Sequence, residues 1–438
     1  MKQRFGRRSG ALILVAALGV LMLVFAACAP AAIPTASPAA KTAAPSGAQP
    51  TVAATVSAAQ PKVAATTAAA KDPIKIGVAA AFSGYAAVIG APLRDAIVMM
   101  EEQTNKAGGI NGYPLKVIYY DDEADETKAV LAMKKLISVD NVIALIGASA
   151  SGIAMAEAPI VEEAGVPWES QGSTNALLNP PKKWVFKTAP GESLQVGPLL
   201  NYLKAKGLTN FGWLSQAAGY GRESRKYMEQ MAPQLGLKAL AVEEYDPTST
   251  DMKPQLTKIK GTNPQALVVV GADPAGAMAI RQAKDLGMTI PILGTPPLTS
   301  ATIMNVKELR DGLEGGIFSS MKPDVWQQLP DSDPQKKAAA ELDKLMAAKY
   351  GSNYKGLEWA AAQGYDAFNL IVNAMKVAKT DPSDLSKARA GVRDALEQTK
   401  GYVGPFGIYT QTPKDHEGFS PDGMTMIQIK DGKPVVIK

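Results

Sequence analysis

Short loops of small and hydroxylic residues follow several of the predicted strands, and these loops hold the side chains that could bind a ligand. In the loop at 147–152, a predicted strand ends and a helix begins near Ser151. Free backbone N–H groups around Ala150, the positive end of the helix dipole, and the hydroxyls of Ser149 and Ser151 could together bind a carboxylate or a similar anion. The structural alternative is that Ser151 only caps its helix.

Other loop residues are candidates for the same cavity. Ser83 follows the first predicted strand, and Thr174 follows the strand next to the 147–152 loop, so each could add a hydroxyl. Tyr220, between two glycines, could place a ring with a polar tip at the mouth of the site. Asp273 could accept a hydrogen bond from an ammonium or amide group. The alternatives are that Thr174 bonds to its own loop and that Asp273 caps the helix beginning at Pro274.

The motifs of several enzyme classes are missing from the sequence. No GxGxxG turn follows the first strand, and GxxxxGK[ST], GxSxG and HExxH do not occur. The single cysteine, Cys28, excludes an intrachain disulfide or a cysteine-cluster metal site, and any Ser-His or Cys-His chemistry would depend on His416 in a polar tail segment. These absences favour binding over catalysis, so we expect no enzyme activity, no metal and no cofactor.

Short β-branched runs alternate with longer amphipathic stretches from residue 74 onward. Because parallel strands need crossover connections, this alternation predicts an α/β fold with parallel sheets and helices on both faces. A second series begins near Phe211, and after Ser319 long helices and two tail strands are expected. The predicted strands are 74–80, 115–121, 142–147, 166–170, 211–215, 239–244, 266–271, 290–294, 316–319, 424–429 and 435–438. The predicted helices are 89–107, 124–139, 151–165, 192–206, 219–235, 250–260, 274–288, 334–350, 357–379 and 384–399.

The formal net charge of +5 on 438 residues is concentrated at the N-terminus. Residues 1–27 carry four basic residues and no acid, and 28–72 add a net +2, which leaves −1 on 73–438. The basic head, the apolar stretch from Ala11 to Ala27 and the small residues before Cys28 predict an export signal peptide over 1–27. An uncleaved membrane anchor is the competing interpretation. The nearly neutral body argues against a nucleic-acid partner.

The residues before Cys28 resemble a bacterial lipobox, although Phe25 stands where an aliphatic residue is usual. This resemblance implies that the signal is cut before Cys28 and that the thiol carries a lipid; a plain secretion signal is the alternative. Residues 28–72 consist mainly of Ala, Pro, Thr and Ser, and their repeated prolines predict an extended, disordered linker. We therefore expect a folded body outside the cytoplasm, tethered to a cell membrane on its periplasmic or outer face.

From residue 73 the chain resembles the periplasmic leucine/isoleucine/valine-binding protein family, the type I substrate-binding proteins of ABC importers. The resemblance implies two doubly wound parallel-sheet lobes, 73–190 plus 321–403 and 191–320 plus 404–438, joined by three hinge crossovers near 188–192, 319–323 and 401–405. The motifs that carry it are Ile74-Lys75-Ile76-Gly77-Val78, Phe82-Ser83-Gly84, Asn105-Lys106-Ala107-Gly108-Gly109-Ile110-Asn111-Gly112, Tyr120-Asp121-Asp122, Ser151-Gly152, Ala164-Gly165-Val166-Pro167, Tyr220-Gly221-Arg222, Gly364-Tyr365-Asp366-Ala367 and Gly404-Pro405-Phe406.

The same resemblance assigns roles to residues of the loops. Ser151 matches the hydroxyl that binds a ligand carboxylate, and Ser149 matches a neighbouring backbone contact. Gly172 and Thr174 match contacts from the next loop, while Tyr220 and Asp273 fall in loops that face the ligand.

The chain departs from the family's amino-acid binders at one point. Those binders place an acid, which pairs with the ligand ammonium, after the strand at 290–294, whereas this chain has Thr295-Pro296-Pro297. We expect a monomeric protein that delivers an amino acid, an amide or a small carboxylate to an ABC permease. The alternatives are a sensory receptor domain on the same fold and an enzyme built on it.

Overall fold

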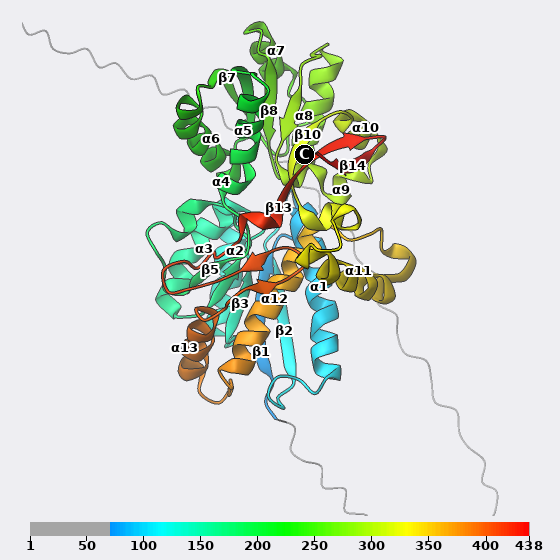
Figure 1. Ribbon diagram of the computed structural model, residues 1–438. Helices are drawn as coiled ribbons and strands as arrows, with labels where there is room; N and C mark the ends of the chain where they lie inside the picture. The colour runs from blue at the N-terminus through cyan, green and yellow to red at the C-terminus, as the bar shows by residue number, and fades with distance from the viewer. Residues whose placement is uncertain (1–70, 438) are drawn as a thin grey trace, which may run out of the picture. The chain divides into compact units, whose positions relative to one another are not determined.

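The structure is a computed structural model that describes residues 71–437 (Figure 1). The predicted signal peptide, Cys28 and nearly all of the predicted linker lie outside the described residues. Within 71–437, no helix combines the length and the apolar character needed to span a membrane.

The first sheet has five parallel strands in the order β2-β1-β3-β4-β5. Helices cover both of its faces, which is why its strands are buried on both sides. Alternate residues of β1 show this: Ile76 and Val78 pack in one core with α1 and α12, while Ala79 packs in another with α2 and α3. The elements are β1 (Ile74–Ala80), α1 (Ala87–Lys106), β2 (Leu115–Asp121), α2 (Glu126–Ser138), β3 (Ala144–Gly147), α3 (Ser151–Ala164), β4 (Trp168–Ser170) and β5 (Val185–Lys187).

The second sheet has seven strands in the order β14-β13-β10-β9-β8-β6-β7. The five strands from β6 to β10 are parallel, and the hairpin β13–β14 adds two antiparallel strands beside β10. The elements are α4 (Glu192–Gln195), α5 (Gly197–Ala205), β6 (Asn210–Gln216), α6 (Gly219–Met231), β7 (Lys238–Tyr245), α7 (Lys253–Gly261), β8 (Ala266–Val270), α8 (Pro274–Asp285), β9 (Ile292–Gly294), α9 (Ala301–Met304), α10 (Lys307–Leu313), β10 (Ile317–Met321), β13 (Met424–Lys430) and β14 (Lys433–Val436).

Three helices follow the second sheet: α11 (Pro334–Tyr350), α12 (Trp359–Val377) and α13 (Leu385–Leu396). The apolar α12 lies alongside α1, and its residues Phe368 and Ile371 are fully buried (Figure 1). Its N-terminal residue, Trp359, is also buried. Because α12 packs on α1, this passage returns the chain from the second sheet to the first.

The segment after α13 also contacts the first sheet. It contains the short strands β11 (Tyr402–Val403) and β12 (Ile408–Tyr409). Asp366 of α12 accepts hydrogen bonds of 3.0 Å from the backbone N–H groups of Phe406 and Gly407, and the Tyr409 hydroxyl donates to the Thr188 carbonyl at 3.2 Å. The chain pairs with the second sheet only from Met424. We therefore propose that the third crossover lies at 420–424, rather than at 401–405 as the sequence suggested.

The α/β class and the parallel sheets predicted from the sequence are confirmed. Several details differ, among them two short helices, α9 and α10, that were not predicted. The helix predicted over 192–206 is two helices, because Pro198 cannot continue the hydrogen bonding of a preceding turn. The strand β5 and the pair β11–β12 were not predicted, since runs of two or three residues carry too little pattern to recognise.

Candidate functional site

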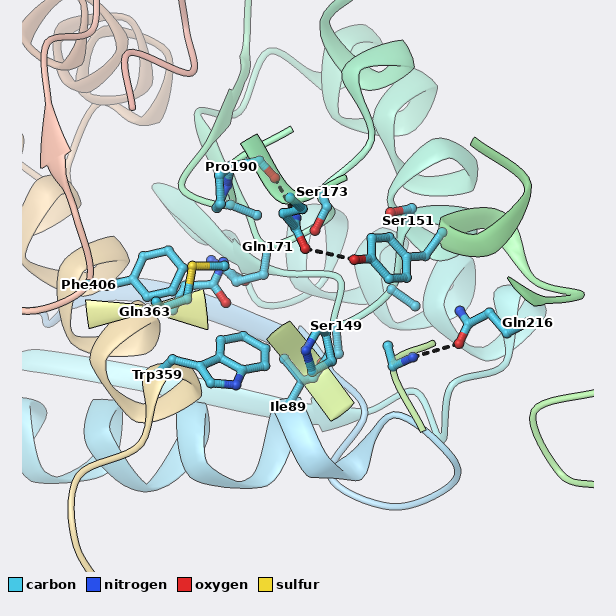
Figure 2. Close-up of a pocket in the computed structure, with 17 residues that line it drawn as sticks. Ile89, Ser149, Ser151, Gln171, Ser173, Pro190, Gln216, Trp359, Gln363 and Phe406 are labelled. Atoms are coloured by element: carbon cyan, nitrogen blue, oxygen red, sulfur yellow. Dashed lines mark hydrogen bonds between the residues drawn. The ribbon is translucent and has the colours of Figure 1, made fainter. Parts of the chain in front are cut away.

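A cavity lies at the carboxyl ends of strands from both sheets, and its empty space, counted together with the part open to solvent, is about 460 Å³ (Figure 2). This is the position where ligands bind in open α/β sheets. Its lining comes from the loops after β3, β4, β5, β8 and β9, from the ends of β6 and β10, from helices α1, α3, α4, α6 and α12, and from the segment between β11 and β12. The lining residues are Ile89, Ser149, Ala150, Ser151, Gln171, Ser173, Ala189, Pro190, Gln195, Gln216, Tyr220, Ala272, Pro297, Met321, Trp359, Gln363 and Phe406.

Four of the predicted ligand-binding residues line this cavity: Ser149, Ala150, Ser151 and Tyr220. Ala150 precedes α3 in an extended conformation, and its methyl side chain offers no cap for the helix N-terminus. The Ser149 hydroxyl accepts a 3.1 Å hydrogen bond from the Ala81 N–H, which anchors the loop to the end of β1. The Ser151 side chain is 2 % exposed, and its oxygen finds no hydrogen-bond partner within residues 71–437.

The N-terminus of α3 therefore offers N–H groups, a positive dipole end and a free hydroxyl at the cavity wall. These are the elements of an anion site that needs neither a metal nor an arginine. In the described chain no group of three or more His, Cys, Asp or Glu side chains is placed to hold a metal ion.

The other four predicted residues do not line the cavity. The Ser83 hydroxyl donates to Asp121 Oδ2 at 2.8 Å on the surface. Thr174 caps the short helix at 175–178, accepting from the Ala176 N–H at 3.2 Å. Gly172 donates its N–H to Ser170 Oγ at 3.1 Å. Each of these residues supports its own loop.

Asp273 likewise has a structural role. Its carboxylate caps α8, accepting from the Gly276 N–H at 2.8 Å, and also accepts from the Tyr245 hydroxyl at 3.2 Å. Burial raises the pKa of Asp273 to about 6. Its neighbour Ala272 lines the cavity instead. Asp273 therefore does not reach the cavity, where it was predicted to contact a ligand ammonium. It caps α8 instead, which was the alternative.

Glutamine side chains supply much of the cavity's polar surface, and none of them was predicted from the sequence as a site residue. Gln216 Oε1 accepts from the Ala272 N–H at 2.7 Å, so its Nε2 remains as a donor (Figure 2). Gln171 Nε2 donates to the Glu169 carbonyl at 3.1 Å, so its Oε1 remains as an acceptor. Gln195 Oε1 accepts from the Tyr220 hydroxyl at 2.7 Å, which fixes the tyrosine ring. The fourth amide, Gln363, comes from α12.

Five buried polar atoms of the lining have no hydrogen-bond partner within the part of the chain that the structure describes. They are Ser151 Oγ, Gln171 Oε1, Gln216 Nε2, Trp359 Nε1 and Gln363 Oε1. A buried polar group left without a partner costs about 1–3 kcal/mol, so such groups in native proteins need an explanation. A ligand or ordered water bound in this cavity would supply partners for these atoms.

The end of the cavity opposite Ser151 is aromatic, with Gln363 beside the rings (Figure 2). Trp359 and Phe406 lie on one side of the cavity and Ser151 and Gln216 on the other (Figure 2). The two ring centroids are 6.2 Å apart with an interplanar angle of 39°. Neither residue was predicted, because each lies far along the sequence from the strand-end loops. The sequence did offer one sign that the start of α12 faces a site: Gln363 is a polar residue within an otherwise apolar stretch of this helix.

A buried ion pair supports the loop that carries Ser173. The Lys187 side chain is fully buried, and its Nζ lies 2.9 Å from the Ser173 carbonyl oxygen and 3.0 Å from Glu417 Oε2. Glu417 also accepts from the Gly191 N–H at 3.0 Å. This contact holds the cavity wall to the segment after β12.

The N-termini of α3 and α6 touch beside the cavity. These helices follow strands of different sheets, and they meet at Gly152 and Gly219. A Cβ atom on Gly219 would lie 2.5 Å from the Gly152 nitrogen and 2.7 Å from its Cα. Only a residue without a side chain allows this approach.

Two doubly wound sheets with a polar and aromatic cavity at their strand ends define the class of two-lobed solute-binding proteins. The sequence profile of the periplasmic binding protein family matches residues 73–434. The chain belongs to this family, as the sequence predicted, and the family implies an extracytoplasmic location.

Named relatives agree with this assignment. The leucine-, isoleucine-, valine-, threonine- and alanine-binding protein of Pseudomonas aeruginosa is 25% identical over 318 residues, which cover 72% of this chain and 81% of that protein. An extracellular ligand-binding receptor from Rhodopseudomonas palustris is 24% identical with a TM-score of 0.77, covering 84% of this chain and 100% of the other. A leucine binding protein from Thermotoga maritima has a TM-score of 0.70 at 22% identity, covering 83% and 98%. At these identities the solved structures establish the fold.

Proposed function

We propose that this protein captures a small carboxylate, amide or amino acid outside the cytoplasm and delivers it to the permease of an ABC importer. The observation that carries the proposal is the cluster of five unpartnered polar atoms around one buried cavity. Relatives of this chain are named as binding proteins, which supports binding as its activity.

The chemistry of capture follows from the polarity of the cavity. A ligand carboxylate or amide oxygen accepts from the α3 N-terminus and from Ser151, where donors converge. The remainder of the ligand packs against Trp359 and Phe406, which remove apolar surface from water. Both sheets contribute to the lining, so the ligand stabilises the arrangement in which the α3 and α6 N-termini touch. On ligand binding, the two lobes close over the cavity by a hinge motion at the crossovers between them.

The membrane attachment forms a second part of the proposal. Cys28 is acylated after removal of 1–27, and 28–72 tether the body near its permease. The protein acts as a monomer. Mass spectrometry of the purified N-terminal peptide tests this point: a diacylglycerol-modified Cys28 is expected, and an unmodified Cys28 or an intact N-terminus would contradict it.

The binding proposal is tested with protein purified under native conditions. Mass spectrometry identifies any retained small molecule, and thermal unfolding is then measured with a panel of amino acids, amides and carboxylates. A ligand at 100 times its dissociation constant stabilises the folded state by about 2.7 kcal/mol, a shift of several degrees. No retained molecule and no stabilisation by any panel member would contradict the proposal.

Ser151→Ala tests the site itself. Loss of the free hydroxyl removes a hydrogen bond to a charged group, worth about 1.5–3 kcal/mol, so the dissociation constant should rise at least tenfold in titration calorimetry. Ser83→Ala is the matched control, because its hydroxyl bonds to Asp121 away from the cavity. Equal affinities for the two variants would show that the cavity is not the binding site.

A further inference from the structure

We infer that the natural ligand carries no ammonium group and is a carboxylate or amide with neutral O–H or N–H donors on an apolar body. This inference rests on the proposed function and narrows its ligand class. It separates the chain from amino-acid binders, although several of its relatives are named for amino acids.

The first support is the charge of the cavity wall. Of the 17 described residues that line the cavity, none has a charged side chain. The neighbouring acids lie outside the lining. Asp273 caps α8, and Glu358 accepts from the Ala301 N–H at 3.0 Å. Glu192 Oε2 accepts from the Asn175 N–H at 2.9 Å, while its buried Oε1 has no partner in the described chain. The described lining thus contains no carboxylate that could pair with a cation.

The second support is the energetic difference between a buried anion and a buried cation at this site. Removing an ammonium from water without an opposite charge costs several kcal/mol. A carboxylate is compensated by the N-terminus of α3 and by Ser151, whereas a cation there meets the same positive dipole unfavourably. Pro297 lines the wall after β9 and adds neither a charge nor a donor.

The third support is the pair of free acceptors. Gln171 Oε1 and Gln363 Oε1 are both buried in the lining without partners in the described chain. The orientation of Gln171 is fixed, because its Nε2 is occupied by the Glu169 carbonyl and by Thr188 Oγ1. Neutral amide oxygens are satisfied by a hydroxyl or an amide N–H and do not neutralise a full positive charge. Trp359 and Phe406 complete the site with an apolar surface.

Pairs of compounds that differ at one group test the inference. The full chain is titrated with leucine and 2-hydroxy-4-methylpentanoate, with phenylalanine and 3-phenyllactate, and with benzoate and benzamide. We expect each hydroxy acid to bind at least tenfold more tightly than the matching amino acid. Binding by the compounds without an amine, and by no amino acid, would be the stronger form of the same result. Equal or tighter binding of an amino acid would overturn the inference and leave the proposed function intact. No binding by any compound, together with no retained small molecule, would overturn both.

A charge substitution provides an independent test. Gln363→Glu places a carboxylate of nearly the same shape in the cavity, and Gln363→Met is the uncharged control. At pH 8 we expect Gln363→Glu to shift the ratio of amino-acid to hydroxy-acid affinity at least tenfold toward the amino acid, and Gln363→Met to leave the ratio unchanged. The free proteins are compared by thermal unfolding to verify folding. A folded Gln363→Glu variant with an unchanged ratio would contradict the placement of the ligand's neutral donors at this residue.

Discussion

Replacement of Gly219 by alanine tests whether the contact between α3 and α6 is made on ligand binding. The new methyl carbon would lie 2.5 Å from the Gly152 nitrogen, whereas ordinary van der Waals contact begins at 3.4 Å. Because both close neighbours are backbone atoms, no side chain can move aside, and the two helix ends must separate by about 1 Å. Overpacking of this kind costs about 1–3 kcal/mol, which corresponds to a rise of about 5- to 150-fold in the dissociation constant.

The assay is titration calorimetry with the retained ligand, combined with thermal unfolding of the ligand-free protein. If the helices touch only after closure, Gly219→Ala weakens binding and leaves the melting temperature of the free protein unchanged. Gly261→Ala is the matched control, because a Cβ at that position at the end of α7 meets only open space. Unchanged affinity would refute the contact. A loss of stability in the free protein equal to the loss in binding would refute its dependence on the ligand.

Three further perturbations follow from the site and its surroundings. Trp359→Leu removes the largest apolar surface of the lining, and we expect calorimetry to show a rise of about 30-fold in the dissociation constant, with Trp326→Leu as a control outside the cavity. Lys187→Met leaves Glu417 without its partner and should lower the free energy of unfolding by about 2–3 kcal/mol in urea titrations; adding Glu417→Gln should recover part of the loss, and full additivity would contradict the ion pair. Burial and the nearby Asp324 raise the pKa of Glu358 from 4.5 to about 8. The folded protein then holds a proton that the unfolded chain releases, so stability should fall as the pH rises from about 4.5 to about 8. Glu358→Gln should reduce this slope in melting curves recorded across that range, and an unchanged slope would contradict the assignment.

The sequence predicted the fold better than it predicted the site. The strands β1 and β2 and the helix α11 have the predicted bounds, because each combines a clear period with a distinct beginning and end. Gly165 ends α3 in the left-handed conformation that glycine favours, with φ 64°. Such features depend only on residues within a few turns of one another, so the sequence alone can predict them.

The site could be predicted only where a strand leads directly into a helix. Ser149 and Ser151 satisfy that condition and line the cavity. Asp273 occupies a similar place, but its own helix provides N–H partners that compete for the carboxylate. Trp359 enters the site through the packing of α12 on α1, and Phe406 through the hydrogen bond from its N–H to the Asp366 carboxylate. Both contacts join residues distant in sequence, which local periodicity does not reveal.

Enclosure of the cavity has a consequence for the kinetics of release. Ser151, Gln171 and Gln363 are each at most 4 % exposed, and the meeting of α3 and α6 lies beside them. If a bound molecule leaves only when the two sheets move apart, its dissociation rate is bounded by the rate of that opening. Ligands of different affinity would then share one ceiling on their dissociation rates. A permease that separates the sheets could release any of them without competing for a single hydrogen bond in the site.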